Sequence, residues 1–197
     1  MLLCQQKRVL IIGDSHVRRI HQVFHEIIQN AAITWMHKGG SGIGFIYNCK
    51  RQIVNYDVVV IATGGNDIAN GKGSRELAHN FYTVCQELLR VNNFVIVCSQ
   101  WPRANKVYND NISAFNYHLE YIFSGSESAK FRWWDRRLKF ATFDGVHLHS
   151  YHRAARHLAS MILFGLCTLG AELMVNLFFY HYCVFSWFVN DVSLHIK

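Results

Sequence analysis

Several features that would assign a chain to a specialised class of protein are missing from these 197 residues. The six cysteines include no CxxC or other close pair, so nothing in their pattern requires an oxidising compartment. We expect Cys85 and Cys98 to be ordinary buried thiols. The formal net charge is +7, but no helix or tail is rich in lysine and arginine. The scattered basic residues indicate a solvated surface, so nucleic acid is not the expected partner, although charge alone leaves it open.

A secretory signal and internal repeats are missing as well. Residues 1–4 are too short for the apolar region of a signal peptide, and residues 5–8 interrupt it, so we expect a cytoplasmic protein. What is present is apolar material: 51% of the residues are hydrophobic and 14% are aromatic. That content supports a substantial core, and the length fits one domain.

Apolar runs and helical patterns alternate along the chain. Runs typical of buried parallel strands cover residues 9–12, 32–36, 58–62 and 94–98. Helical spacing of apolar residues covers residues 17–29, 74–91, 109–123 and 150–163. This alternation predicts an α/β domain, with a parallel sheet covered on both faces.

The C-terminal part of the chain differs from the rest. We expect a domain over residues 1–165, followed by an apolar, aromatic-rich extension over residues 166–197. Within it, residues 173–189 form an apolar stretch near the lower length limit for a membrane span, which would give membrane contact. Three interpretations stay open: a non-native or poorly ordered extension, a tail packed on the domain, and a membrane anchor.

Polar motifs fall where the predicted strands end. GDSH (13–16), GGSGIG (39–44) and GGND (64–67) follow the first three strands, and DGVHLH (144–149) precedes the last helix. Ligands of parallel α/β sheets bind at the carboxyl ends of the strands, so these motifs predict a site. Alone, GDSH is compatible with a serine nucleophile, an Asp–His metal pair or a simple turn.

Taken in order, the four motifs resemble the conserved blocks of the SGNH, or GDSL-type, hydrolase family, over roughly residues 8–165. The resemblance implies a three-layer α/β/α flavodoxin-like fold with a central parallel sheet of about five strands. It also implies an esterase that cleaves small acyl esters, such as acetyl esters, of lipids or carbohydrates. No cofactor or metal is implied, and the expected partner is a small-molecule ester.

The family's functional residues carry over onto matching positions. Ser15 matches the nucleophile, while Asp144 and His147 match the last block. Gly42 and Asn66 match the glycine and asparagine blocks, which join the Ser15 N–H in the oxyanion hole. In such an arrangement, the histidine removes the serine proton and the aspartate fixes the imidazole tautomer.

Three further residues have supporting positions in this assignment. Asp14 is expected to bond the backbone around the turn, and Asp67 supports the site beside Asn66. As an alternative to a role in the site, Asn66 and Asp67 only cap the loop that follows them. His16 stands where the family usually has an apolar residue, and it either points to solvent or lines the site. The glycine-rich motif GGSGIG, residues 39–44, is called the glycine loop below. It lacks the asparagine that is commoner in this block of the family, which leaves Gly40 as an alternative to Gly42.

Other interpretations stay open. Asp14 and His16 form a DxH pattern like that of calcineurin-like metallophosphoesterases, but the glycine and the GDxxD motif that accompany it there are missing. A histidine cluster suggests zinc, although its spacing matches no strong site: His147, His149 and His152. A non-catalytic binding module with the same fold, of the kind found in some invertebrate retroelements, is the remaining alternative.

Overall fold

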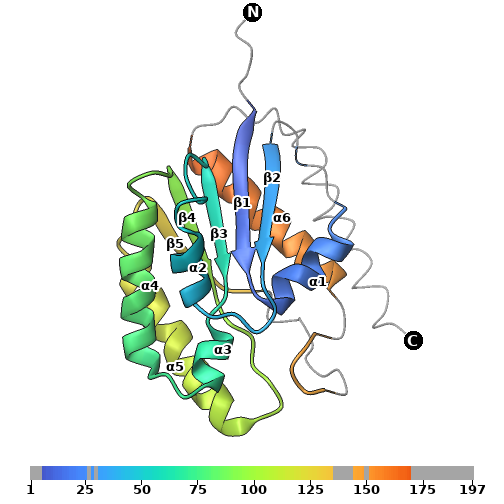
Figure 1. The fold of residues 1–197 in the computed structure, drawn as a ribbon, viewed down its shortest axis with the longest axis vertical. Coiled ribbons are helices and arrows are strands. Elements are labelled where there is room, and N and C mark those ends of the chain that lie inside the picture. Colours follow the sequence, from blue (N-terminus) through green and yellow to red (C-terminus); the bar gives the residue numbers. More distant parts are fainter. Residues whose placement is uncertain (1–5, 26–27, 29–30, 135–143, 149–150, 170–197) are drawn as a thin grey trace, which may run out of the picture.

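The computed structural model describes residues 6–25, 28, 31–134, 144–148 and 151–169, in which strands and helices alternate (Figure 1). The strands are β1 (Lys7–Gly13), β2 (Ala31–His37), β3 (Val58–Ala62), β4 (Phe94–Cys98) and β5 (Ala129–Arg132). The helices are α1 (Ser15–Val23), α2 (Gly44–Cys49), α3 (Gly65–Ala69), α4 (Ser74–Leu88), α5 (Lys106–Phe123) and α6 (His152–Thr168).

The five strands form one parallel sheet in the order β2-β1-β3-β4-β5. Gly13, the last residue of β1, pairs with His37 at the end of β2 and with Ala62 at the end of β3. The loops that follow these three strands therefore leave the sheet from the same edge. This register brings three of the four motifs together.

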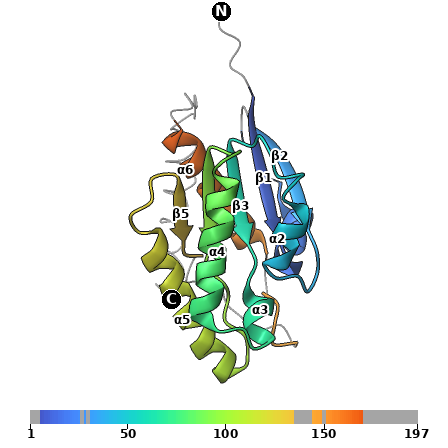
Figure 2. The same ribbon diagram turned by 60° about the vertical axis from the view of Figure 1, so that its left-hand side comes forward.

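Helices cover both faces of the sheet. Figures 1 and 2 show α1 and α6 on one face, with α2, α3, α4 and α5 on the other. Along β1, Val9 and Ile11 enter the core beneath α1 and α6, while Leu10 and Ile12 pack toward α4 and α5. The predicted three-layer α/β/α class with a parallel sheet of about five strands is confirmed.

The end of β1 requires a glycine. A Cβ on Gly13 would overlap the carbonyl oxygen of Ala62 and the side chain of Val17. Because Gly13 has no side chain, the first turn of α1 packs directly against the end of β3. Asp14 and Ser15 are thereby placed at the edge of the sheet.

Some element boundaries differ from the predictions. Helix α1 ends at Val23, and Phe24 has extended backbone, with φ −81° and ψ 106°. The predicted helix over residues 17–29 is therefore wrong at residues 24, 25 and 28, the described positions beyond Val23. Phe24 and Ile28 nevertheless pack against the core under α1, which explains why the apolar spacing continues past the helix. Strand β5 and the short helices α2 and α3 are absent from the sequence prediction.

The described chain extends a little beyond the predicted domain boundary at residue 165. Helix α6 continues to Thr168, and Leu166 is fully buried. The stretch 173–189 lies outside the described residues. Among the helices that the structure describes, none has the length and hydropathy needed to cross a membrane. Cys85 and Cys98 are fully buried, as predicted.

Candidate active site

The first group of the site stands at the start of α1. Ser15 is the first helical residue, and Asp14 is the N-cap, whose Oδ1 accepts the N–H of His16 at 2.9 Å. Asp14 is only 2% exposed. Burial raises the pKa of its carboxyl from 3.8 to about 6, although the His16 N–H and the charge of Arg103 act in the opposite direction.

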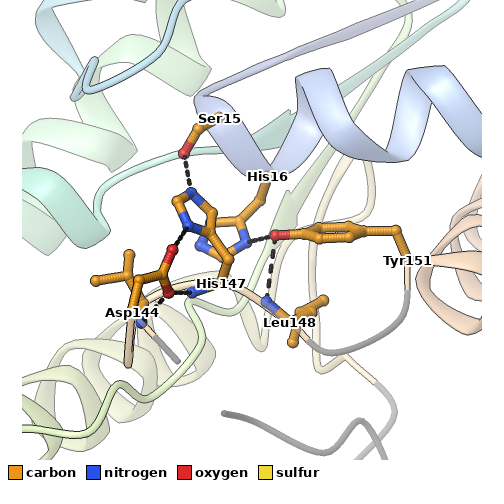
Figure 3. Close-up of polar contacts among 7 residues, drawn as sticks. Ser15, His16, Asp144, His147, Leu148 and Tyr151 are labelled. Atoms are coloured by element: carbon orange, nitrogen blue, oxygen red, sulfur yellow. Dashed lines mark hydrogen bonds and ion pairs between the residues drawn. The ribbon is translucent and has the colours of Figure 1, made fainter. Parts of the chain in front are cut away.

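Ser15, His147 and Asp144 form a continuous line of polar contacts (Figure 3). Asp144 Oδ2 lies 2.6 Å from His147 Nδ1, and His147 Nε2 lies 3.3 Å from Ser15 Oγ. A carboxylate only accepts, so the imidazole hydrogen belongs on Nδ1, and Nε2 is left to accept the serine proton. The structure thus brings these three predicted residues together across 132 positions of sequence.

Asp144 also shapes the turn that carries His147. Its Oδ1 accepts the N–H of Val146 at 2.9 Å and that of His147 at 3.0 Å. The His147 side chain is 18% exposed and that of Asp144 is 34% exposed, so the pair borders solvent. One carboxylate therefore fixes both the backbone and the ring of His147.

Asn66 lies near Ser15 through its contact with Asp14. Its Nδ2 donates to the Ser41 carbonyl at 2.9 Å and to Asp14 Oδ2 at a longer 3.5 Å. Its Oδ1 accepts from Arg103 Nη2 at 2.9 Å. Asn66 therefore joins the glycine loop, the α1 cap and Arg103, with its amide nitrogen directed toward the first two.

Asp67 holds the glycine loop against α3. Its Oδ2 accepts the N–H of Ile43 at 2.8 Å, and its Oδ1 forms an ion pair with Lys72 at 2.5 Å. The Asp67 carboxylate also occupies the space beside the Gly42 Cα. Gly40, the alternative to Gly42, has a left-handed φ of 70° and no heavy atom near its missing Cβ.

His16 is buried, with 5% of its surface exposed, so the interpretation that it points to solvent is wrong. Its Nδ1 lies 2.9 Å from Tyr151 Oη, and its ring centroid lies 4.5 Å from that of Trp101. Burial is the main cause that lowers its pKa to about 3. Because Asp14 caps the helix while His16 binds Tyr151, the two side chains do not converge as a DxH metal pair would.

Sequence reasoning missed two residues of this region. Arg103 reaches Asn66 from the loop after β4, and its guanidinium carbon lies 4.6 Å from the centre of the Tyr108 ring. Tyr151, just before α6, reaches His16. Neither residue belongs to a motif, and both act through contacts between distant segments, so no local signal in the sequence identifies them.

The remaining sequence candidates lie in different places. Of the histidine cluster, His149 lies outside the described residues, and His152 is exposed. Within the described ranges, no three side chains of His, Cys, Asp or Glu gather in a way that would hold a metal ion.

Comparison with known proteins finds similarity in structure alone. No protein-family model and no curated protein matches the chain. A protein assigned as an acylhydrolase from Bacteroides fragilis superposes with a TM-score of 0.67 at 18% identity, over 82% of this chain and 88% of its own. A lipolytic protein of the G-D-S-L family from Veillonella parvula superposes with a TM-score of 0.65 at 18% identity, over 80% and 96%.

An acetylxylan esterase from Geobacillus stearothermophilus has the same fold. It superposes with a TM-score of 0.63 at 13% identity, over 84% of this chain and 96% of its own. The chain therefore has the fold of SGNH, GDSL-type, acylhydrolases and esterases. The resemblance predicted from the four motifs is confirmed at the level of fold.

Proposed function

We propose that the chain is a serine hydrolase that cleaves small acyl esters with Ser15 as nucleophile, His147 as base and Asp144 as its partner. One observation carries the proposal: the unbroken contact line from Asp144 Oδ2 to His147 Nδ1 and from His147 Nε2 to Ser15 Oγ. The 3.3 Å contact is long for a proton transfer, but catalytic hydrogen bonds of this kind shorten when substrate binds.

The chemistry follows the arrangement of these groups. His147 Nε2 takes the proton of Ser15 as Oγ attacks the ester carbonyl, and Asp144 stabilises the resulting imidazolium. The same histidine then returns the proton to the leaving alcohol, which departs as the acyl–serine ester forms. Water, activated by His147, hydrolyses that ester and regenerates the serine.

The oxyanion of each tetrahedral intermediate needs hydrogen-bond donors near Ser15. We assign this role to the N–H groups of Ser15 and Gly42 and to the Asn66 carboxamide, as the family resemblance implies. The position of Asn66 beside Asp14 and Ser41 supports the assignment, because the amide nitrogen faces the segment that carries the nucleophile. Donors of this kind stabilise the charge that develops in the transition state.

The proposed substrates are small acyl esters, such as acetyl esters, of carbohydrates or lipids. The acetylxylan esterase and the lipolytic G-D-S-L protein among the solved structures of this fold support that class. Neither determines the alcohol half of the ester, so a short-chain aryl ester is the suitable first substrate.

The test uses p-nitrophenyl acetate turnover and covalent labelling by a fluorophosphonate probe. We expect both in the wild-type chain and neither above background in Ser15→Ala. Ser124→Ala is the matched control, because Ser124 is exposed, caps α5 and donates to the local Tyr121 carbonyl. Turnover and labelling that persist in Ser15→Ala would exclude Ser15 as the nucleophile.

A catalytically silent binding module is the second candidate, and one observation favours it. The Asn66 amide nitrogen already donates to the Ser41 carbonyl at 2.9 Å, so one of its two hydrogens is not available to an oxyanion. This candidate predicts a folded wild-type chain with no labelling and no Ser15-dependent turnover.

A further inference from the structure

A second connection joins α1 to the segment that carries His147, beside the Ser15–His147 contact (Figure 3). His16 Nδ1 lies 2.9 Å from Tyr151 Oη, and Leu148 N–H donates to the same oxygen at 3.3 Å. His16 directly follows Ser15, and Leu148 directly follows His147. The connection therefore joins the residues that directly follow Ser15 and His147, whose side chains must meet for catalysis.

The contacts of Tyr151 Oη bear on the protonation of both side chains. An amide N–H can only donate, so Tyr151 Oη accepts from Leu148. The same oxygen can give its own hydrogen to His16 Nδ1 or accept a second one from it, and we take the first arrangement, in which the Tyr151 hydroxyl both accepts and donates. His16 Nδ1 is then the unprotonated nitrogen of a neutral imidazole. Burial lowers the pKa of His16 to about 3 and raises that of Tyr151 to about 12, which agrees with two neutral partners. The connection is therefore maintained throughout the neutral pH range.

The backbone around His147 is held on both sides. Before it, Asp144 Oδ1 accepts the N–H groups of Val146 and His147 itself. After it, Tyr151 holds the N–H of Leu148, which is 2% exposed. Tyr151 thus adds a polar attachment between this turn and α1, beside the contact of His147 with Ser15.

The His16 ring also fills the space behind the catalytic imidazole. Its centroid lies 5.4 Å from that of His147 and 4.5 Å from that of Trp101. A leucine at position 16 would fill much of this space but would offer no acceptor to Tyr151. The histidine that departs from the family pattern is thus the residue that makes the connection possible.

We infer that His16 and Tyr151 are positioning residues that hold the His147 turn against the start of α1. They thereby set the distance between His147 Nε2 and Ser15 Oγ. Their effect on catalysis rests on the proposed hydrolase function, whereas their effect on the turn does not. Both effects are measurable, and they require different experiments.

Kinetics with p-nitrophenyl acetate test the catalytic effect. We expect Tyr151→Phe and His16→Leu to lower kcat by about tenfold or more with KM within about twofold, because small displacements of reacting groups slow chemistry more than binding. His16→Asn, whose carboxamide oxygen lies near the former Nδ1, should recover part of kcat. Tyr121→Phe, at an 82% exposed tyrosine of α5, is the matched control. If Tyr151→Phe and His16→Leu keep the wild-type kcat, the inference is overturned while the proposed function stands.

Amide hydrogen exchange at Leu148, measured by NMR on the full chain, tests the connection without any substrate. Exchange should be faster in Tyr151→Phe and His16→Leu than in wild type, and unchanged in Tyr121→Phe. If the wild-type chain shows no Ser15-dependent turnover, the proposed function fails, and exchange alone decides the inference. Faster exchange then supports the connection, and equal exchange in all variants overturns it.

Discussion

The Asp14 carboxyl and the His16 imidazole are both buried at the start of α1, and burial shifts their pKa values in opposite directions. The pKa of Asp14 rises from 3.8 to about 6, while that of His16 falls from 6.5 to about 3. Each shift favours the neutral form of its group. The two shifts therefore have opposite consequences for stability against pH.

Between about pH 4 and pH 6, native Asp14 holds a proton that the unfolded chain has lost, so its contribution to the free energy of unfolding falls as pH rises. Over the same range, unfolded His16 holds a proton that the native chain lacks, so its contribution rises with pH. Each slope has a magnitude of about 1.4 kcal/mol per pH unit, and the two nearly cancel in the wild type.

Single substitutions separate the two contributions. Relative to wild type, the unfolding free energy of Asp14→Asn should increase by about 1.4 kcal/mol per pH unit from pH 4 to pH 6. That of His16→Asn should decrease by about the same amount, since it removes a group whose contribution rises with pH. Asparagine remains a good N-cap at position 14, which keeps α1 intact. Urea unfolding at several pH values measures these differences, and parallel curves for all three proteins would contradict the assigned shifts.

Gly42→Ala and Gly44→Ala form a matched pair in the glycine loop. A Cβ on Gly42 would overlap the Asp67 carboxylate, whereas a Cβ on Gly44 meets no heavy atom within 4 Å. We expect Gly42→Ala to lower the free energy of unfolding by about 1–3 kcal/mol, the usual cost of overpacking. Gly44→Ala should be neutral or stabilising by up to about 1 kcal/mol. Urea denaturation distinguishes them, and equal effects of the two substitutions would refute the packing argument.

The sequence predicts those parts of the fold that produce a local pattern, either a continuous apolar run or a helical period. Residues 9–12 of β1, and the whole of β3 and β4, are continuous apolar runs buried on both sides, so composition alone marks them. Strand β5, with the sequence AKFR at the edge of the sheet, has no such run. Helices α2 and α3 have six and five residues, which is too short for a helical period to show.

The candidate site divides in the same way. Ser15, Asn66 and the Asp144–His147 pair stand in short motifs, so their residue types and order were available from the sequence. The sequence did not reveal the direction of the His16 side chain, because that direction depends on Tyr151, which lies 135 residues away. Arg103 is likewise placed by tertiary contacts, 37 residues from its partner Asn66. Local spacing carries no information about such pairs.

Asp144→Asn should abolish most activity while keeping the turn. The carboxamide oxygen of the substituted side chain can still accept the backbone N–H groups of Val146 and His147, but its NH2 group would then face His147 Nδ1. His147 Nδ1 must then accept a hydrogen bond from this NH2 group, so the imidazole hydrogen moves to His147 Nε2. With that hydrogen, Nε2 can no longer take the Ser15 proton. We expect kcat for p-nitrophenyl acetate to fall by about 10³–10⁴-fold. Asp110→Asn, at an exposed position of α5, controls for the charge change, and a kcat within tenfold of wild type would contradict the role of Asp144.

Arg103 should act on catalysis only through Asn66. Arg103 Nη2 donates to Asn66 Oδ1 at 2.9 Å, so Arg103 fixes which way the Asn66 carboxamide faces. Asn109 in turn holds the Arg103 backbone by two hydrogen bonds of 2.7 Å. Asn66→Ala should lower kcat by about 10²–10³-fold, the usual cost of one oxyanion donor. Arg103→Lys, which loses the planar guanidinium, should lower kcat by about tenfold at similar KM. In the double variant the arginine substitution should add nothing to the effect of Asn66→Ala, since its target is gone. Steady-state kinetics of this cycle, with the exposed Arg75→Lys as control, tests the coupling, and additive losses would show that Arg103 acts elsewhere.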